Sequence, residues 1–278
     1  MLYTMSEILK DAQEKKYGVG YFNCINLEMT RAYIQAAEDC HSPIIIGTSE
    51  GLTKKYVPFD WIAPLLLYAA RKAKVPVAVH LDHTYHFEVL MQALRAGFGS
   101  VMFDGSQLSY EENIAVSREI ADIAHPMGVG LECELGYVGG IKAADGTIPA
   151  NVATDPEIVP DFVERTQADF LAVSIGTVHG VYATTPHLDL ERLGRIREKI
   201  SLPLVLHGGS GLSDEDFAAT IAGGISKVNI FTDVITAGAE SLNEAKEMRY
   251  PDMQKASTAA MYEATVKKLK CFGSTNRY

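Results

Sequence analysis

The sequence predicts an α/β protein built as a single closed (β/α)8 barrel with additional C-terminal helices. Eight short apolar or β-branched runs alternate with amphipathic stretches along the chain. Strict alternation indicates parallel strands, because parallel neighbours need long crossovers. The runs are nearly continuous in apolar residues, as expected of strands covered on both faces. Eight such units in roughly 250 residues fit a TIM barrel better than an open doubly wound sheet.

The eight apolar runs are the predicted strands. They are Gly18–Phe22, Ile44–Thr48, Val77–Leu81, Ser100–Phe103, Gly130–Glu134, Phe170–Ile175, Leu204–Leu206 and Lys227–Phe231. The amphipathic intervals predict helices at Met5–Lys16, Leu27–Asp39, Phe59–Lys74, Phe87–Ala96, Tyr110–His125, Asp155–Gln167, Leu190–Lys199 and Asp214–Ala222. Ser213 followed by an acidic first turn is typical of a helix start. The segment Thr154-Asp155-Pro156-Glu157 predicts a similar start, with Pro where its missing donor costs little.

The C-terminal segment lengthens the chain beyond the eight units. No linker of low complexity divides the sequence, so we expect residues 1–278 to form one barrel domain. Residues 237–278 would form a helical extension with helices at Ala239–Met248 and Met253–Lys270, packed outside the barrel or against a second subunit.

Composition argues against two classes of partner. The net charge is −10 with a pI near 5.3, and lysine and arginine are scattered, so no nucleic-acid partner is expected. The N-terminus lacks a basic region followed by an apolar core, and no apolar run approaches the roughly 18 residues of a membrane helix. We therefore expect a cytoplasmic protein with no membrane partner.

The four cysteines form no CxxC pair and are expected to be buried free thiols.

Polar residues follow the predicted strands at their carboxyl ends, where active sites of this fold lie. They are Asn23, Ser49, Asp82, His83, Asp104, Glu134, His179, His207 and Asn229. Three of them are histidines, His83, His179 and His207. Three neutral imidazoles with an open fourth position form a catalytic zinc site, in which the ion is a Lewis acid. The other five histidines (His41, His80, His86, His125 and His187) are interpreted as structural.

Carboxylates accompany these histidines. Asp82 is the natural proton carrier beside His83, with orientation of a histidine as the alternative role. Glu134 shares one side of its strand with Glu132. Glu134 is either an alternative metal position or a hydrogen-bonded rim carboxylate, and Asp104 has the same two interpretations.

Two loops favour an anionic ligand. The turn His207-Gly208-Gly209-Ser210-Gly211 precedes a helix, and backbone N–H groups of such turns bind phosphate, although any turn needs glycine. The loop after the eighth predicted strand, Asn229–Asp233, lies where this fold often completes a phosphate site.

Seven ordered motifs resemble the class II, zinc-dependent ketose-bisphosphate aldolases, the family of fructose- and tagatose-bisphosphate aldolases. They are Phe22-Asn23, His80-Leu81-Asp82-His83, Met102-Phe103-Asp104-Gly105-Ser106, Glu132-Cys133-Glu134-Leu135-Gly136, Ile175-Gly176-Thr177-Val178-His179-Gly180, His207-Gly208-Gly209-Ser210-Gly211 and Asn229-Ile230-Phe231-Thr232. The resemblance covers nearly the whole chain.

The resemblance implies a role for each matched position. His83, His179 and His207 would bind Zn2+, and Asp82 would exchange a proton with the aldehyde-derived C4 oxygen. Dihydroxyacetone phosphate would be held by Gly180, Gly208, Gly209, Ser210, Asn229, Ile230, Phe231 and Thr232, with Asn229 also contacting the enediolate. Asn23 and Ser49 complete the predicted substrate-binding set. A monovalent cation (Na+ or K+) near the phosphate and a homodimer or homotetramer are further implications.

The sequence departs from the family pattern at a loop. Lys142 stands where the family has the glutamate that protonates the enediolate carbon. Asp145 is one substitute, Lys142 could instead bind an anionic substrate group, the proton could come through water, or Lys142 is a solvated loop lysine. Phe231 and Ala183 also differ from residues found in relatives, which bears on the second phosphate and the sugar stereochemistry.

Three functions follow from these patterns. The first is a zinc-dependent aldolase that reversibly cleaves a ketose 1,6-bisphosphate (fructose or tagatose type) to dihydroxyacetone phosphate and an aldehyde, with no lysine Schiff base. The second is an aldolase of the same family for a different ketose phosphate, such as a deoxy or acidic sugar. The third is a non-catalytic sugar-phosphate binding protein.

Overall fold

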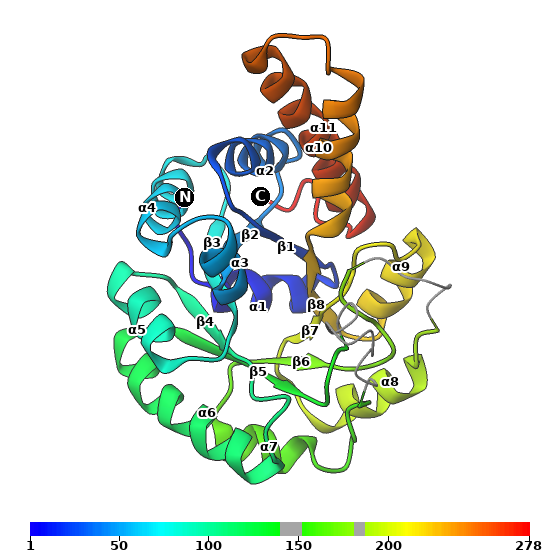
Figure 1. The fold of residues 1–278 in the computed structure, drawn as a ribbon. Coiled ribbons are helices and arrows are strands. Elements are labelled where there is room, and N and C mark those ends of the chain that lie inside the picture. The colour runs from blue at the N-terminus through cyan, green and yellow to red at the C-terminus, as the bar shows by residue number, and fades with distance from the viewer. Residues whose placement is uncertain (140–151, 181–186) are drawn as a thin grey trace, which may run out of the picture.

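The computed structural model describes residues 1–139, 152–180 and 187–278, in which eight parallel strands close a barrel in chain order (Figure 1). The strands are β1 Val19–Asn23, β2 Ile44–Ser49, β3 Val77–Thr84, β4 Ser100–Phe103, β5 Gly130–Leu135, β6 Phe170–Val173, β7 Leu204–Leu206 and β8 Ile225–Ile230. Strand β1 pairs with both β2 and β8, so that Phe22 lies opposite Ile46 on one side and Ile230 on the other. The predicted TIM barrel is confirmed.

Helices surround the barrel (Figure 1). They are α1 Met5–Lys15, α2 Leu27–Asp39, α3 Glu50–Lys55, α4 Phe59–Lys72, α5 Phe87–Ala96, α6 Tyr110–Ala124, the short 3-10 helix η1 His125–Met127, α7 Val159–Thr166, α8 Leu190–Lys199, α9 Asp214–Ala222, α10 Thr232–Glu244 and α11 Tyr250–Cys271. No helix in the described ranges is long and apolar enough to cross a bilayer. The division into one barrel domain with residues 237–278 as an extension stays a prediction.

Helix α1 closes the amino end of the barrel. A capping box between Thr4 and Glu7 starts this helix, and its apolar face, at helical spacing from Met5 to Ala12, enters the barrel interior. There it packs against inward-facing strand residues such as Tyr21 and Phe170. This packing fills the amino end of the barrel interior with mainly apolar side chains.

The start of α7 corrects one prediction. The helix begins at Val159 rather than at Asp155. Thr154 cannot cap a helix, because its hydroxyl donates to the Leu135 carbonyl and accepts from the Ser174 amide. The threonine thus joins β5 to the end of β6, and residues 155–158 form a turn before the helix.

Other boundaries also differ from prediction. Strand β8 begins at Ile225, two residues early, and β6 ends at Val173, two residues early. Helix α3 was not predicted; the Ser49 hydroxyl caps it by accepting from the Leu52 amide. Helix α10 begins at Thr232, seven residues before the predicted start of the first tail helix, and packs along α11. The predicted cap of α9 at Ser213 is confirmed as a capping box.

All four cysteines are free thiols. Cys24 and Cys133 are buried, as predicted, whereas Cys40 and Cys271 are only partly buried. Cys133 lies in the apolar layer between the strands and the outer helices, so the carboxylates on either side of it point into the barrel.

Candidate metal and catalytic site

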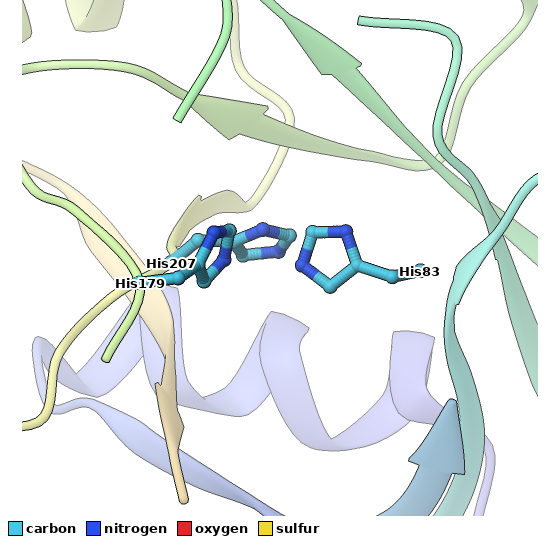
Figure 2. A group of neighbouring side chains, drawn as sticks. All are labelled: His83, His179 and His207. Carbon is cyan, nitrogen blue, oxygen red and sulfur yellow. The ribbon is translucent and has the colours of Figure 1, made fainter. Parts of the chain in front are cut away.

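Three histidines converge at the carboxyl end of the barrel. His83 comes from β3, His179 from the loop after β6 and His207 from the loop after β7. The ring centroid of His83 lies 4.8 Å from that of His179 and 4.5 Å from that of His207. Figure 2 shows the His83 ring facing the other two rings. One nitrogen from each ring lies within 4.8 Å of the others, so the predicted triad assembles.

The facing nitrogens form no hydrogen bonds with the described protein, although Nδ1 of His207 lies 3.3 Å from Glu134 Oε2. Among the described residues, Nε2 of His83, Nε2 of His179 and Nδ1 of His207 are buried without a hydrogen bond. Buried polar atoms are nearly always paired, so three unpaired nitrogens around one point need an explanation. A metal ion supplies one, because imidazole nitrogens are its usual ligands and three of them suit zinc. The donor set therefore fits a catalytic metal site.

Carboxylates hold two of these rings in place. His83 Nδ1 lies 2.8 Å from Asp104 Oδ2, and His207 Nε2 lies 3.0 Å from Glu132 Oε1. Such pairs fix the tautomer that presents the other nitrogen to a metal. Asp104 also accepts from the backbone and hydroxyl of Ser106. Burial would raise the pKa of Asp104, but these partners outweigh it and hold the pKa well below its ordinary range.

The imidazole pKa values differ within the triad. Burial, together with His83 and His207, lowers the pKa of His179 to about 3, which keeps this ring neutral and able to bind a metal. Burial also lowers the pKa of His207, but the hydrogen bond to Glu132 and the Glu134 carboxylate, whose Oε2 lies 3.3 Å from Nδ1, outweigh it and raise that pKa to about 10. A metal ion binding at His207 would therefore displace a proton.

Glu134 lies at the edge of this group. Its Oε1 accepts from the Val138 amide at 2.9 Å, while its Oε2 lies 3.3 Å from His207 Nδ1 and has no hydrogen bond. With His83 and Asp104 it forms a second set of donors that lie within 4.8 Å of one another. This geometry suits the alternative metal position, which stays a prediction.

Asp82 is buried beside the triad. Its two oxygens accept from Asn229 Nδ2 at 3.1 and 3.3 Å, and Lys227 Nζ lies 4.0 Å away. Burial raises the pKa of Asp82, but the positive charges of His83 and Lys227 outweigh it, so the net shift is downward. The carboxylate is thus ionised at neutral pH and able to accept a proton.

An irregular strand end brings Asp82 and His83 to the same site. Adjacent strand residues normally point to opposite faces. Here the pairing of β3 with β4 shifts register between Leu81 and Thr84, and His83 has a φ of 32°. This left-handed backbone turns the imidazole toward His179 and His207, although Asp82 precedes it directly.

The loops after β7 and β8 are joined to each other. The Ser210 hydroxyl accepts from the backbone amides of Phe231 and Asp233 at 3.2 and 3.3 Å. Gly208 has a φ of 66°, and a Cβ there would lie 2.3 Å from the Val178 carbonyl oxygen, so this turn requires glycine. The predicted phosphate-binding positions of the two loops are therefore neighbours.

A cleft of about 260 Å³ opens beside the triad. It is lined by Ser49, Gly51, His83, Tyr85, Asp104, Gln107, Tyr137, Val138 and His179. No lysine or arginine is among these described lining residues. Asn23 is not in the lining; its side chain accepts from the Tyr21 hydroxyl at 2.7 Å.

Several site residues were missed or fall outside the described chain. Lys142, Asp145 and Ala183 lie outside the described residues. Tyr85, Gln107 and Tyr137 carried no motif that would have singled them out. Lys227 and His80 were not assigned to the site, yet both side chains are buried in the barrel interior near Asp82. The signal was present, since each lies two residues before a site residue on the same strand.

Known proteins resemble this chain over its full length. The sequence profile of the family described as fructose-bisphosphate aldolase class-II matches residues 3–277. A relative from Bacillus subtilis (strain 168), named probable fructose-bisphosphate aldolase, is 40% identical over 286 residues, which cover 99% of each chain. Fructose-bisphosphate aldolase of Staphylococcus aureus (strain Mu50) is 39% identical with the same coverage.

A solved structure agrees with these sequence matches. The crystal structure of the YdjI aldolase from Escherichia coli K12 has a TM-score of 0.91 and 37% identity, and the match covers 99% of both chains. A putative fructose-1,6-bisphosphate aldolase from Coccidioides immitis has a TM-score of 0.90 at 31% identity, covering 98% of this chain and 96% of the other. The chain therefore belongs to the class II fructose-bisphosphate aldolase family and is a lyase of that class.

Proposed function

We propose that this protein is a zinc-dependent aldolase that reversibly cleaves a ketose 1,6-bisphosphate, of the fructose or tagatose type, to dihydroxyacetone phosphate and an aldehyde. The observation that carries the proposal is the set of three unpaired, buried imidazole nitrogens beside the ionised Asp82. Class II aldolases are typically metal-dependent, and three nitrogen ligands with an open position suit zinc.

The residues of the site would divide the chemistry between them. His83, His179 and His207 would hold the ion, which when bound supplies Lewis-acid polarisation of substrate oxygens. Asp82 would take the proton from the C4 hydroxyl as the C3–C4 bond breaks and return it in the condensation direction. Asn229 would keep the Asp82 carboxylate in place through its amide N–H groups.

The buried lysine of the barrel does not suit a Schiff base. Its ammonium lies 2.8 Å from Glu132 Oε2, and an ion-paired ammonium is a poor nucleophile. This pairing supports the metal-dependent route over covalent catalysis by Lys227.

The joined loops after β7 and β8 would hold the phosphate of dihydroxyacetone phosphate. The proposed positions are Gly180, Gly208, Gly209, Ser210, Asn229, Ile230, Phe231 and Thr232, with Asn23 and Ser49 completing the substrate site. Backbone N–H groups in glycine-rich turns and at helix starts favour phosphate, and α10 begins at Thr232. A monovalent cation, Na+ or K+, beside this phosphate is part of the same proposal.

A second candidate substrate is a different ketose phosphate, with an aldehyde half that lacks a phosphate. The described cleft lining offers the hydroxyls of Ser49, Tyr85 and Tyr137 and the amide of Gln107, but no cationic side chain. A panel of fructose and tagatose bisphosphates against deoxy, acidic and unsubstituted ketose 1-phosphates separates the two candidates by kcat/KM. The bisphosphate proposal would be wrong if a ketose 1-phosphate were cleaved at least tenfold more efficiently.

Metal removal tests the main proposal. Chelation should abolish cleavage, and added zinc should restore it. Full activity of the stripped protein, or inactivation by borohydride in the presence of substrate, would contradict the proposal. A non-catalytic sugar-phosphate binding protein would bind dihydroxyacetone phosphate without zinc-dependent proton exchange at its C3, whereas the aldolase should show that exchange.

The assembly and compartment are proposed as well. We propose a homodimer or homotetramer in the cytoplasm, acting on phosphorylated sugars and binding neither nucleic acid nor membrane. Sedimentation velocity of the purified protein would reveal a monomer if the first part is wrong.

A further inference from the structure

Lys227 lies in the barrel interior beneath the histidine triad. Its side chain on β8 has no solvent exposure, and no other described lysine or arginine is buried to that extent. The ammonium lies 2.8 Å from Glu132 Oε2 on β5, 4.0 Å from Asp82 Oδ1 on β3 and 4.7 Å from the centroid of the Tyr21 ring on β1. A fully buried ammonium needs such partners, because burying an unpaired charge is costly.

The surroundings of Lys227 resemble a second metal site. His80, Asp82 and Glu132 offer donor atoms within 4.8 Å of one another. The Lys227 ammonium already lies against both carboxylates and supplies the positive charge that a metal would otherwise bring. His80 does not supply it, because burial and the neighbouring Lys227 lower its pKa to about 3. In this second group the Lys227 ammonium thus stands where a metal ion would otherwise bind.

Glu132 connects Lys227 to the histidine triad. Its Oε2 lies 2.8 Å from Lys227 Nζ, while its Oε1 lies 3.0 Å from Nε2 of His207. Because Oε2 is held by the ammonium, Oε1 is fixed in the direction of His207. In the neutral ring that binds a metal, this contact places the proton on Nε2 and leaves Nδ1 for the shared point of the triad.

We propose that Lys227 is a positioning residue of the metal site: through Glu132 it fixes the ring orientation and tautomer of His207. This inference rests on the proposed function in one respect, namely that the triad binds zinc. Lys227 itself contacts neither the triad nor the cleft. Lys227 acts on His207 through Glu132 and does not act on the substrate. Its effect should therefore be measurable as a change in metal affinity in the absence of substrate.

A double-mutant cycle tests the chain of contacts. Lys227→Met keeps an unbranched side chain, one atom shorter, and removes the ammonium. Glu132→Gln removes the charge while keeping an oxygen for His207. Each single variant should bind zinc about 10–100-fold more weakly in competition with a chelator. The double variant should match Glu132→Gln within about threefold, because Lys227 acts through Glu132 and coupled residues are not additive. The Co2+-loaded variants should also have altered visible absorption, which reports ligand geometry.

The controls separate positioning from folding. Lys199→Met removes an exposed ammonium that lies 2.7 Å from Glu157 and should leave zinc affinity and the Co2+ spectrum unchanged. Lys227→Met alone leaves the charge of Glu132 buried without its partner, whereas the double variant lacks both charges. If Lys227→Met does not fold, the zinc affinity of the double variant is compared with that of Glu132→Gln instead.

Two results would overturn the inference. One is native zinc affinity and an unchanged Co2+ spectrum in folded Lys227→Met. The other is a double variant at least tenfold weaker than Glu132→Gln, since the two residues would then act independently. Failure of the native protein to cleave any ketose phosphate would count against the proposed function alone, because affinity and spectrum are measured without turnover.

Discussion

Asp82→Asn separates proton transfer from metal binding. The substitution keeps the size of the side chain and leaves one oxygen to accept from Asn229, which now lies 3.1 and 3.3 Å from the two carboxylate oxygens. It removes the charge that would accept the C4 proton. Asp82 is not one of the three proposed zinc ligands, so the substitution should change zinc affinity far less than kcat.

The structure sets the size of the expected loss. General acid–base groups contribute about 10²–10⁴-fold to rate, which corresponds to about 2.7–5.4 kcal/mol at 1.36 kcal/mol per tenfold. Only 1% of Asp82 is exposed, so water has poor access to replace the carboxylate. We therefore expect kcat for cleavage to fall toward the upper end, by about 10³–10⁴-fold.

Two assays on the zinc-loaded variant check this reasoning. Cleavage is followed by coupled reduction of dihydroxyacetone phosphate, and proton exchange at C3 of that product is followed by NMR. Exchange does not involve the C4 oxygen, so it should persist when cleavage is lost. Asp122→Asn, which changes an exposed carboxylate paired with Arg118, is the matched control. Cleavage within tenfold of native, or equal loss of both activities, would refute the assignment of Asp82.

Three further predictions concern the metal site and the buried Glu50 at the start of α3. Asp104→Asn removes the charge that lies 2.8 Å from His83 and should weaken zinc about 10–100-fold in chelator competition, with unchanged circular dichroism. Zinc at 100 times its Kd should stabilise the chelated protein by about 2.7 kcal/mol, measured by urea unfolding, and no zinc-dependent shift would contradict the site. Burial raises the pKa of Glu50, but hydrogen bonds from Lys54 and the backbone amides of Tyr85 and His86 lower it more, so the net shift is downward. The stabilisation from the ionised Glu50 is therefore fully present above its unfolded pKa, near the ordinary value of 4.5. It is lost as the pH falls through the lower pKa of the folded state. Glu50→Gln should therefore cost about 1–3 kcal/mol at pH 7 and much less at low pH, and an equal cost at both would contradict this.

The repeating pattern of the chain predicted the barrel because periodicity is a local property. Each apolar run became a strand, and the polar residues after the runs lie at one end of the barrel, as a parallel arrangement requires. Boundaries were predicted less well where a side chain has a tertiary partner. Thr154 is a residue type that often caps helices, but here its hydroxyl forms hydrogen bonds with the Leu135 carbonyl and the Ser174 amide.

The site was predicted where a residue type implies chemistry and was missed where position alone matters. The three histidines could be recognised as donors that meet at one end of the barrel, and Asp82 as a candidate proton carrier beside them. The left-handed backbone at His83 could not, because a φ of 32° depends on the register shift between β3 and β4. Lys227 has no catalytic motif of its own, and its importance comes from Glu132, which is 95 residues earlier in the chain.

The charges at this end of the barrel favour the binding of a cation. Four carboxylates, Asp82, Asp104, Glu132 and Glu134, are buried there, and each would be costly to bury alone. Lys227 offsets part of this charge, and the raised pKa of His207, about 10, adds a proton that offsets more. A divalent metal bound by the triad would take over from that proton and bring a larger positive charge to the same place. The carboxylates thus favour both the ligand geometry and the presence of the ion, and Asp82 can stay ionised next to it.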